Sequence, residues 1–168
     1  MTRDRQRADG SPTKQVGIAE YTVVTDDTQL STSGVGSCLG IVLRDSFSDV
    51  SGLIHVMLPT AAESRDGNPP KFVDTGLPLL IEEMVEAGAS KRRLEGWVVG
   101  GSEMLSFSTD GDSIGSRNIA AAKQAFEHYG IDVVGTDVGG SHGRSIRFDP
   151  ADETVTIQTA DDNTTQTI

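Results

Sequence analysis

The sequence predicts an α+β fold in a single domain. Its 168 residues are a typical length for one compact domain. Seven short segments have the composition of strands, and only two segments have the period of a helix. A sheet and an amphipathic helix each have an apolar face to bury. We therefore expect both helices to lie on a sheet, and that sheet to pack on another.

The predicted strands are short runs rich in Val, Ile and other residues that favour an extended backbone. They are residues 21–24, 39–43, 53–58, 97–99, 132–134, 145–148 and 154–157. The last two runs flank Asp149-Pro-Ala-Asp152, whose composition favours a tight turn. We expect these two strands to form a hairpin.

Two segments repeat apolar residues at the i, i+3, i+4, i+7 spacing of an amphipathic helix. The first is predicted to begin near Asp74 or Thr75 and to end at Gly88, with the apolar face Leu77, Leu80, Ile81 and Met84. The second is predicted from about Ser116 to Tyr129, where Gly130 ends it, with the face Ile119, Ala122, Phe126 and Tyr129.

The ends of the chain and its charge limit the classes of function. Residues 1–17 and 159–168 are polar and are predicted to be disordered tails around a domain at residues 18–158. The 25 acidic and 14 basic residues give a net charge of −11 without a Lys- or Arg-rich stripe, so nucleic acid is not an expected partner. This balance is typical of halophilic proteins, in which salt screens the repulsion. No apolar run approaches the roughly 20 residues that span a bilayer, so we expect a cytoplasmic protein without membrane insertion.

Cys38 is the only cysteine in the sequence. It therefore belongs to no internal disulfide and no multi-cysteine metal site, and we expect neither a metal nor a cofactor. A thiol becomes a nucleophile when a neighbouring base takes its proton and leaves a thiolate beside an imidazolium. Gly34 and Gly36 allow a sharp turn that leaves backbone N–H groups near the thiol free to bind an oxyanion.

His55 is the favoured base for this thiol. In an alternating strand it shares a face with Leu53 and Met57, where a polar ring needs a partner. On composition alone His128 and His142 stay open as alternatives.

Two glycine-rich segments, Val99-Gly-Gly-Ser102 and Gly139-Gly-Ser-His-Gly143, lack the spacing of a nucleotide-binding loop and the lysine that usually follows it. We interpret them as structural, and expect them to let loops pass close to the end of the sheet that carries Cys38. Arg144, which follows, is expected to pair with a core carboxylate.

Several short motifs together resemble the CheD family. Gly34-Val-Gly-Ser-Cys38-Leu-Gly is followed, seventeen residues after the cysteine, by the histidine of Gly52-Leu-Ile-His55, and Thr32 stands six residues before the cysteine. The other matches, in order, are Lys71-Phe-Val-Asp74, Val99-Gly-Gly-Ser102, Ile114-Gly-Ser-Arg117-Asn118, Asp137-Val-Gly-Gly140 and Gly143-Arg144. They span residues 21–157, and the combination is more specific than any one motif. Ser102 stands where the family more often has alanine.

The resemblance implies a three-layer α/β/β sandwich and a cysteine-dependent protein-glutamine glutaminase, a hydrolase that deamidates the cytoplasmic helices of chemoreceptors in chemotaxis. It makes Cys38 the nucleophile, His55 the general base and Thr32 the residue that orients the imidazole. Cys38 would attack the side-chain amide of a receptor glutamine, ammonia would leave, and water would hydrolyse the thioester to glutamate.

The resemblance also suggests residues around this triad. The candidates for substrate binding are Gly36, Ser37, Arg117 and Asn118, although the last two could instead cap the second helix. A threonine steadies an imidazolium less than a carboxylate does. Nearby hydroxyl groups therefore stay open as substitutes for Thr32, namely Ser31, Ser33 and Ser37.

Two other functions are compatible with the resemblance. CheD proteins also bind CheC, a phosphatase of the chemotaxis response regulator, so the chain is alternatively a binding module that regulates CheC with little or no catalysis. An intact set of Thr32, Cys38 and His55 favours the enzyme, because a pure adaptor has no need of a thiol beside a base. Methylesterase activity on receptor glutamyl esters is a related alternative, with methanol leaving in place of ammonia.

Overall fold

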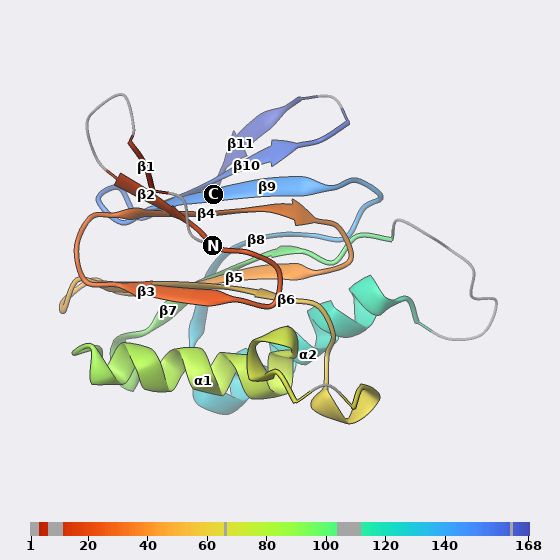
Figure 1. Cartoon of the computed structure of the whole chain (residues 1–168), viewed down its shortest axis with the longest axis horizontal. Coiled ribbons are helices and arrows are strands. Elements are labelled where there is room, and N and C mark those ends of the chain that lie inside the picture. Colours follow the sequence, from red (N-terminus) through yellow and green to blue (C-terminus); the bar gives the residue numbers. More distant parts are fainter. Residues whose placement is uncertain (1–3, 7–11, 66, 104–111, 162) are drawn as a thin grey trace.

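The fold has three layers, as the sequence predicts. The structure, a computed structural model, describes residues 4–6, 12–65, 67–103, 112–161 and 163–168. Two helices lie on one side of a five-stranded sheet, and a six-stranded sheet covers the other side (Figure 1). The α+β prediction and the α/β/β layering are confirmed.

The five-stranded sheet is the middle layer, with the strand order β3-β6-β5-β7-β8. Its strands are β3 (Tyr21–Val24), β5 (Leu39–Asp45), β6 (Val50–Val56), β7 (Glu95–Gly100) and β8 (Asp132–Val138). Every residue of β5 and β6 is buried, because one face of these strands packs on the helices and the other on the second sheet. Any polar side chain in these two strands is therefore removed from water.

The six-stranded sheet has the order β1-β2-β4-β9-β10-β11. Its strands are β1 (Asp4–Gln6), β2 (Pro12–Gln15), β4 (Gln29–Val35), β9 (Arg144–Asp149), β10 (Thr154–Thr159) and β11 (Thr165–Thr167). Burial alternates along β9 because only one face meets the middle layer. Across the two sheets the rings of Trp97 and Phe148 lie 5.1 Å apart.

The predicted strands all occur, and β9 and β10 form the expected antiparallel hairpin. Sequence patterns missed β4, whose Gln29-Leu-Ser-Thr-Ser-Gly-Val is mostly polar. Residues 4–6, 12–15 and 165–167, which the sequence predicts to lie in tails, form strands of the second sheet, with residues 4–6 and 165–167 at its two edges. The division into residues 1–17, 18–158 and 159–168 stays a prediction.

The two helices lie close to their predicted bounds, but of the apolar face predicted for the second helix Ala122 and Phe126 are buried, Ile119 is partly buried and Tyr129 is exposed. Helix α1 (Val73–Glu86) buries the expected apolar face. Helix α2 (Ile114–Tyr129) begins two residues earlier than predicted, because the Ser113 side chain accepts a hydrogen bond from the Ser116 backbone N–H and caps the helix. Gly130 ends α2 in the left-handed conformation, at φ 66°. Short 3₁₀ turns are η1 (Ala61–Glu63), η2 (Pro69–Lys71) and η3 (Lys91–Arg93).

Within the described residues, neither of these helices nor any other has the length and apolar composition to cross a membrane.

Candidate active site

Cys38 and His55 lie at the open end of the β5–β6 hairpin. In the antiparallel register Gly40 is opposite His55. Cys38 comes two residues before Gly40, immediately ahead of β5. Opposite residues share a face of a sheet, and so do residues two positions apart on one strand. The paired residues end at Leu39 and Val56; extending the register one residue beyond them would put Cys38 diagonal to His55, on the face toward the second sheet.

The imidazole of His55 is fully buried between the two sheets and has one partner. Its Nδ1 lies 2.8 Å from Thr32 Oγ1, a hydrogen bond that joins β6 to β4 across the inter-sheet layer. Its Nε2 is buried without a hydrogen-bond partner among the described residues. A buried polar atom without a partner is costly and uncommon in folded proteins. Nε2 is therefore the free end of an oriented ring.

Gly40 lets the two sheets approach each other at this point. A Cβ added to Gly40 would lie 2.3 Å from Ile146 Cδ1 and 3.6 Å from Thr32 Cγ2. A side chain here would force the end of the Ile146 side chain to move, while the contact to Thr32 is at ordinary van der Waals distance. Gly40 ends the sequence motif around Cys38, but the sequence alone does not indicate this close approach of the two sheets.

The other candidates for base and orienting residue lie elsewhere. Alternation along β4 turns Ser31 and Ser33 to the outer face of the second sheet, where they line a groove. His128 lies near the end of α2 in edge contact with Tyr129, and His142 lies in the loop between β8 and β9. Among the described residues only Thr32 contacts His55 through a hydroxyl group.

The loop before Cys38 leaves backbone donors free. A bulge in β4 between Thr32 and Val35 contains Gly34 at φ 70°, and the chain turns from there into the loop. In the described part of the chain, the backbone N–H groups of Ser37 and Cys38 have no hydrogen-bond acceptor in another residue. Two such groups beside a thiol are suited to binding an oxyanion. Gly36, unlike Gly34, does not have a positive φ.

The two glycines that follow β7 hold the other side of Cys38. Gly100 and Gly101 have φ values of 120° and 69°, and the Gly101 N–H donates to the Cys38 carbonyl oxygen at 2.8 Å. A Cβ on Gly100 would lie 2.3 Å from that oxygen. The interpretation of Val99-Gly-Gly-Ser102 as a segment that passes close to Cys38 is therefore confirmed.

Burial favours the uncharged forms of both side chains. It lowers the pKa of His55 to about 4 and raises the pKa of the half-buried Cys38 thiol, an effect partly opposed by the thiol's own backbone N–H. In the absence of substrate, a neutral thiol and a neutral imidazole are therefore the favoured state at neutral pH. The sequence-based expectation of a thiolate beside an imidazolium does not describe this state.

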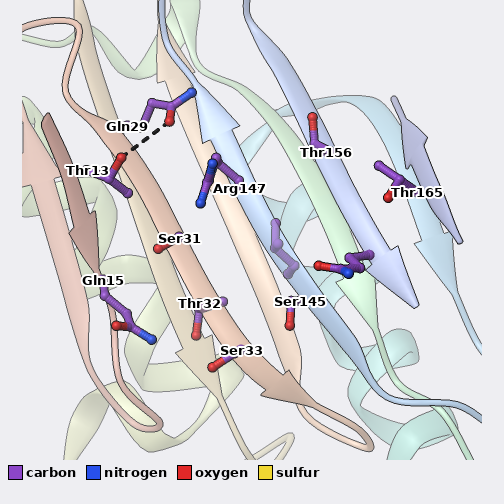
Figure 2. A pocket seen from close by; sticks show the side chains of 12 residues that line it. Thr13, Gln15, Gln29, Ser31, Thr32, Ser33, Ser145, Arg147, Thr156 and Thr165 are labelled. Carbon is purple, nitrogen blue, oxygen red and sulfur yellow. Dashed lines mark hydrogen bonds between the residues drawn. The ribbon is translucent and has the colours of Figure 1, made fainter. Parts of the chain in front are cut away.

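A groove of about 570 Å³ lies on the opposite side of β4 (Figure 2). Its lining is almost entirely hydroxyl and amide side chains, with Arg147 the one charged residue among them. Thr13 Oγ1 donates to Gln29 Oε1 at 3.3 Å within it. Thr32 and Ile146 also line this groove, whereas Cys38 and His55 do not.

Comparison with known proteins gives a consistent result. The family model described as CheD chemotactic sensory transduction matches residues 57–159. A probable chemoreceptor glutamine deamidase CheD from Haloarcula marismortui is 51% identical over 135 residues, which are 80% of this chain and 78% of the relative. The chain belongs to the CheD family. A probable chemoreceptor glutamine deamidase CheD from Natronomonas pharaonis is 41% identical over 155 residues, 92% of each chain. The chemoreceptor glutamine deamidase CheD of Halalkalibacterium halodurans is 38% identical over 149 residues, 86% of this chain and 92% of the relative.

The remaining candidates in this CheD-family chain have well-defined partners. Arg117 forms an ion pair with Glu63. Arg144 is buried and donates from Nε to Asp137 Oδ2 at 3.0 Å, so it pairs with a carboxylate as expected, but Asp137 is partly exposed on the edge strand β8 and is not a core residue. Asn118 is fully buried on α2 and does not cap the helix, a role that Ser113 fills.

No group of three or more His, Cys, Asp or Glu side chains is arranged to hold a metal ion in the described ranges of the chain.

Proposed function

We propose that this chain is a chemoreceptor glutamine deamidase with Cys38 as its nucleophile. The relatives' names supply the substrate class, and belonging to the same family supports carrying it over. The observation that carries the chemistry is the His55 imidazole, which Thr32 holds by Nδ1 while Nε2 has no partner among the described residues, on the face that the β5–β6 register predicts for Cys38. An oriented base beside a lone thiol is the arrangement that acyl transfer through a thioester needs.

In the first step Cys38 Sγ attacks the amide carbon of a receptor glutamine. His55 Nε2 takes the thiol proton as the bond forms. This step uses the tautomer in which Nδ1–H donates to Thr32 Oγ1, 2.8 Å away, and Nε2 accepts. The amide oxygen becomes an oxyanion, for which the donors are the N–H groups of Ser37 and Cys38, which have no acceptor in another described residue.

In the second step the tetrahedral intermediate collapses to a thioester. His55 returns its proton to the leaving nitrogen, and ammonia departs. Water then attacks the thioester carbon while His55 takes a proton from it, and collapse of this intermediate expels the thiolate, which takes the proton back. The products are glutamate on the receptor and the original Cys38 thiol. A neutral receptor side chain has become an anion.

The neutral resting pair fits this sequence of steps. A buried imidazolium and a buried thiolate would both be poorly solvated. The charges form only when substrate occupies the site, where backbone donors and the departing amine can compensate them.

Two further assignments follow from this function. We propose the cytoplasm as the place of action, because the substrate glutamines lie on the cytoplasmic helices of chemoreceptors. CheC stays a predicted partner, and binding between the two purified proteins would test it.

The function is tested by incubating the protein with a cytoplasmic chemoreceptor fragment and mapping its peptides by mass spectrometry. Deamidation replaces an amide NH₂ with a hydroxyl, and the mass change can be assigned to single glutamines. We expect conversion by the wild type and by the control variant Ser33→Ala, whose side chain lines the outer groove, and none by Cys38→Ala. A wild type that leaves every glutamine intact would overturn the function. Conversion by Cys38→Ala at the wild-type rate would overturn the nucleophile.

A further inference from the structure

Asn118 connects the loop of Cys38 to the strand of His55. Its Nδ2 donates to the Ser37 carbonyl oxygen at 2.9 Å and to the Met57 carbonyl oxygen at 3.0 Å. The first carbonyl precedes Cys38 directly, and the second comes two residues after His55. One buried amide thus ties together the two segments that carry the candidate nucleophile and base. Helix α2 begins at the same end of the molecule as the connection from β4 to β5 (Figure 1).

The bond to Ser37 also determines how the Cys38 backbone is aimed. The Ser37 carbonyl and the Cys38 N–H belong to one planar peptide unit and point in opposite directions. Holding the carbonyl toward Asn118 therefore directs the N–H away from α2. The next peptide unit is fixed by Gly101, whose N–H donates to the Cys38 carbonyl. Each of the two peptide units that flank Cys38 therefore accepts a hydrogen bond from a residue outside the Cys38 loop, Asn118 for one and Gly101 for the other.

The orientation of the Asn118 amide follows from its partners. Both are carbonyl oxygens, which only accept, so the NH₂ group must face them. The Oδ1 atom is buried and has no hydrogen-bond partner within the described part of the chain. The contribution of this side chain is therefore its two donated bonds. Losing both would remove this donor from two carbonyl groups in a partly buried region.

Close contact between α2 and the loop after β7 makes this reach possible. A Cβ on Gly115 would lie 2.4 Å from the Gly101 carbonyl oxygen and 2.5 Å from that of Ser102. The first turn of α2 therefore packs directly on backbone, and Asn118, one turn later, enters the gap between the Cys38 loop and the end of β6.

We propose that Asn118 is a positioning residue that sets the geometry between Cys38 and His55. It does not touch the reacting atoms. It acts through Ser37 and Met57, by holding the thiol within reach of Nε2 and by aiming the Cys38 N–H at the oxyanion. This inference rests on the proposed function in one respect, that His55 serves Cys38 as its base.

The test measures alkylation of Cys38 by iodoacetamide, which reports on one site because the chain has one cysteine. Base assistance by a neutral His55 predicts a rate that is nearly constant from about pH 5 to 7 and then rises as thiolate forms. We expect Asn118→Ala to lose this plateau and to react about tenfold more slowly at pH 7, the size of effect that one or two lost hydrogen bonds produce. Asn118→Asp keeps the shape of the side chain but puts a carboxylate oxygen, which only accepts, opposite the carbonyl groups of Ser37 and Met57. It should therefore lose the plateau as Asn118→Ala does.

A double-mutant cycle with His55→Ala separates positioning from general loosening. In the His55→Ala background, Asn118→Ala should slow alkylation no further, because no imidazole remains for the Cys38 thiol to be positioned against. Phe126→Leu, a core change at the other end of α2, is the destabilised control and should keep the plateau. Melting temperatures show which variants are folded, and Asn118→Asp replaces Asn118→Ala if the latter is not.

Two outcomes would overturn the proposal. One is a folded Asn118 variant with the wild-type plateau, and the other is an equal slowing with and without His55. The assay uses no receptor, so it fails independently of the proposed function. If the double-mutant cycle shows that Asn118 and His55 are coupled but the protein deamidates no receptor glutamine, this inference would stand and the proposed deamidase function would be rejected.

Discussion

Asp45 at the turn of the β5–β6 hairpin and His55 near its open end are both fully buried, yet their surroundings differ. Asp45 accepts hydrogen bonds from Arg93 Nε at 3.0 Å and from the Ser90 N–H at 2.8 Å. Burial alone would raise its pKa, but bonds from Arg93, Ser90 and Ser48 hold that pKa well below the usual range. Among the described residues, the His55 imidazole has one hydrogen bond, at Nδ1, and its Nε2 has no partner; burial lowers its pKa to about 4.

The comparison shows two roles for a buried polar side chain: Asp45 stabilises the fold, whereas His55 is available for chemistry. At the turn, the buried charge is matched by donors, so its interactions stabilise the fold. At the open end, the buried atoms are only partly satisfied, which costs stability and leaves them able to bind something else. The buried guanidinium group of the neighbouring Arg44 is likewise matched by partners, namely Ser51, Asp49 and Glu153. Substitutions at the two ends should therefore change different measured quantities.

The largest expected effect is on rate. His55→Gln removes the general base, and we expect deamidation to slow by about 10² to 10⁴-fold at pH 7. Asp45→Asn, at the other end, should keep the wild-type rate per folded molecule. Receptor peptide mapping measures both rates. If the two variants lost activity equally, the separation of chemistry from stability between the two ends would be wrong.

The next effect is on stability. Asp45→Asn removes the buried charge from its donors, and we expect the free energy of unfolding to fall by about 3 kcal/mol. Asp49→Asn removes a carboxylate whose side chain is 55% exposed, and it should cost less than about 1 kcal/mol. Urea unfolding at pH 7 in molar KCl compares them. Equal losses would show that Asp45 is no more important to the turn than a surface carboxylate.

The pH dependence of stability should also differ between the two ends. In the unfolded chain His55 takes up a proton near pH 6.5, whereas in the folded chain it does so near pH 4. The unfolded state therefore binds more protons between these values, and the stability present above pH 6.5 is lost as the pH falls toward 4, by up to about 3 kcal/mol. Asp45, whose folded pKa is lowered, gives stability that is present above about pH 3.9 and lost only below it.

Unfolding curves of the wild type and His55→Gln between pH 4 and 7 test this window. The difference in stability between them should narrow or reverse as the pH falls, because only the wild type has this histidine to protonate. A difference that is constant with pH would contradict the lowered pKa of His55.

The smallest expected effect concerns Thr32. Thr32→Val keeps the shape but removes the hydroxyl group that hydrogen-bonds His55 Nδ1, and we expect kcat to fall about tenfold with little change in KM. Thr32→Ser keeps the hydroxyl and should recover most of the rate. If Thr32→Ser were as slow as Thr32→Val, the methyl group and its packing would matter more than the hydrogen bond.

Sequence alone determined the features that depend on local chemistry. The periodicity of α1 and α2 and the glycine that ends α2 follow from neighbours within a few residues, and so do the strands rich in branched residues. Cys38 and His55 were identified as a pair by residue type and by family resemblance. Their chemical roles stay proposals that the substitutions above test.

Tertiary structure decided what depends on contacts between distant residues. Thr32 and His55 are 23 residues apart, and Asn118 and Ser37 are 81 apart. The polar strand β4 has little propensity of its own and exists because it pairs with β9 and packs on the middle layer. That packing selects Thr32 over Ser31 and Ser33. It also removes His55 from water and so keeps its ring neutral, a consequence of the second sheet that no pattern near residue 55 encodes.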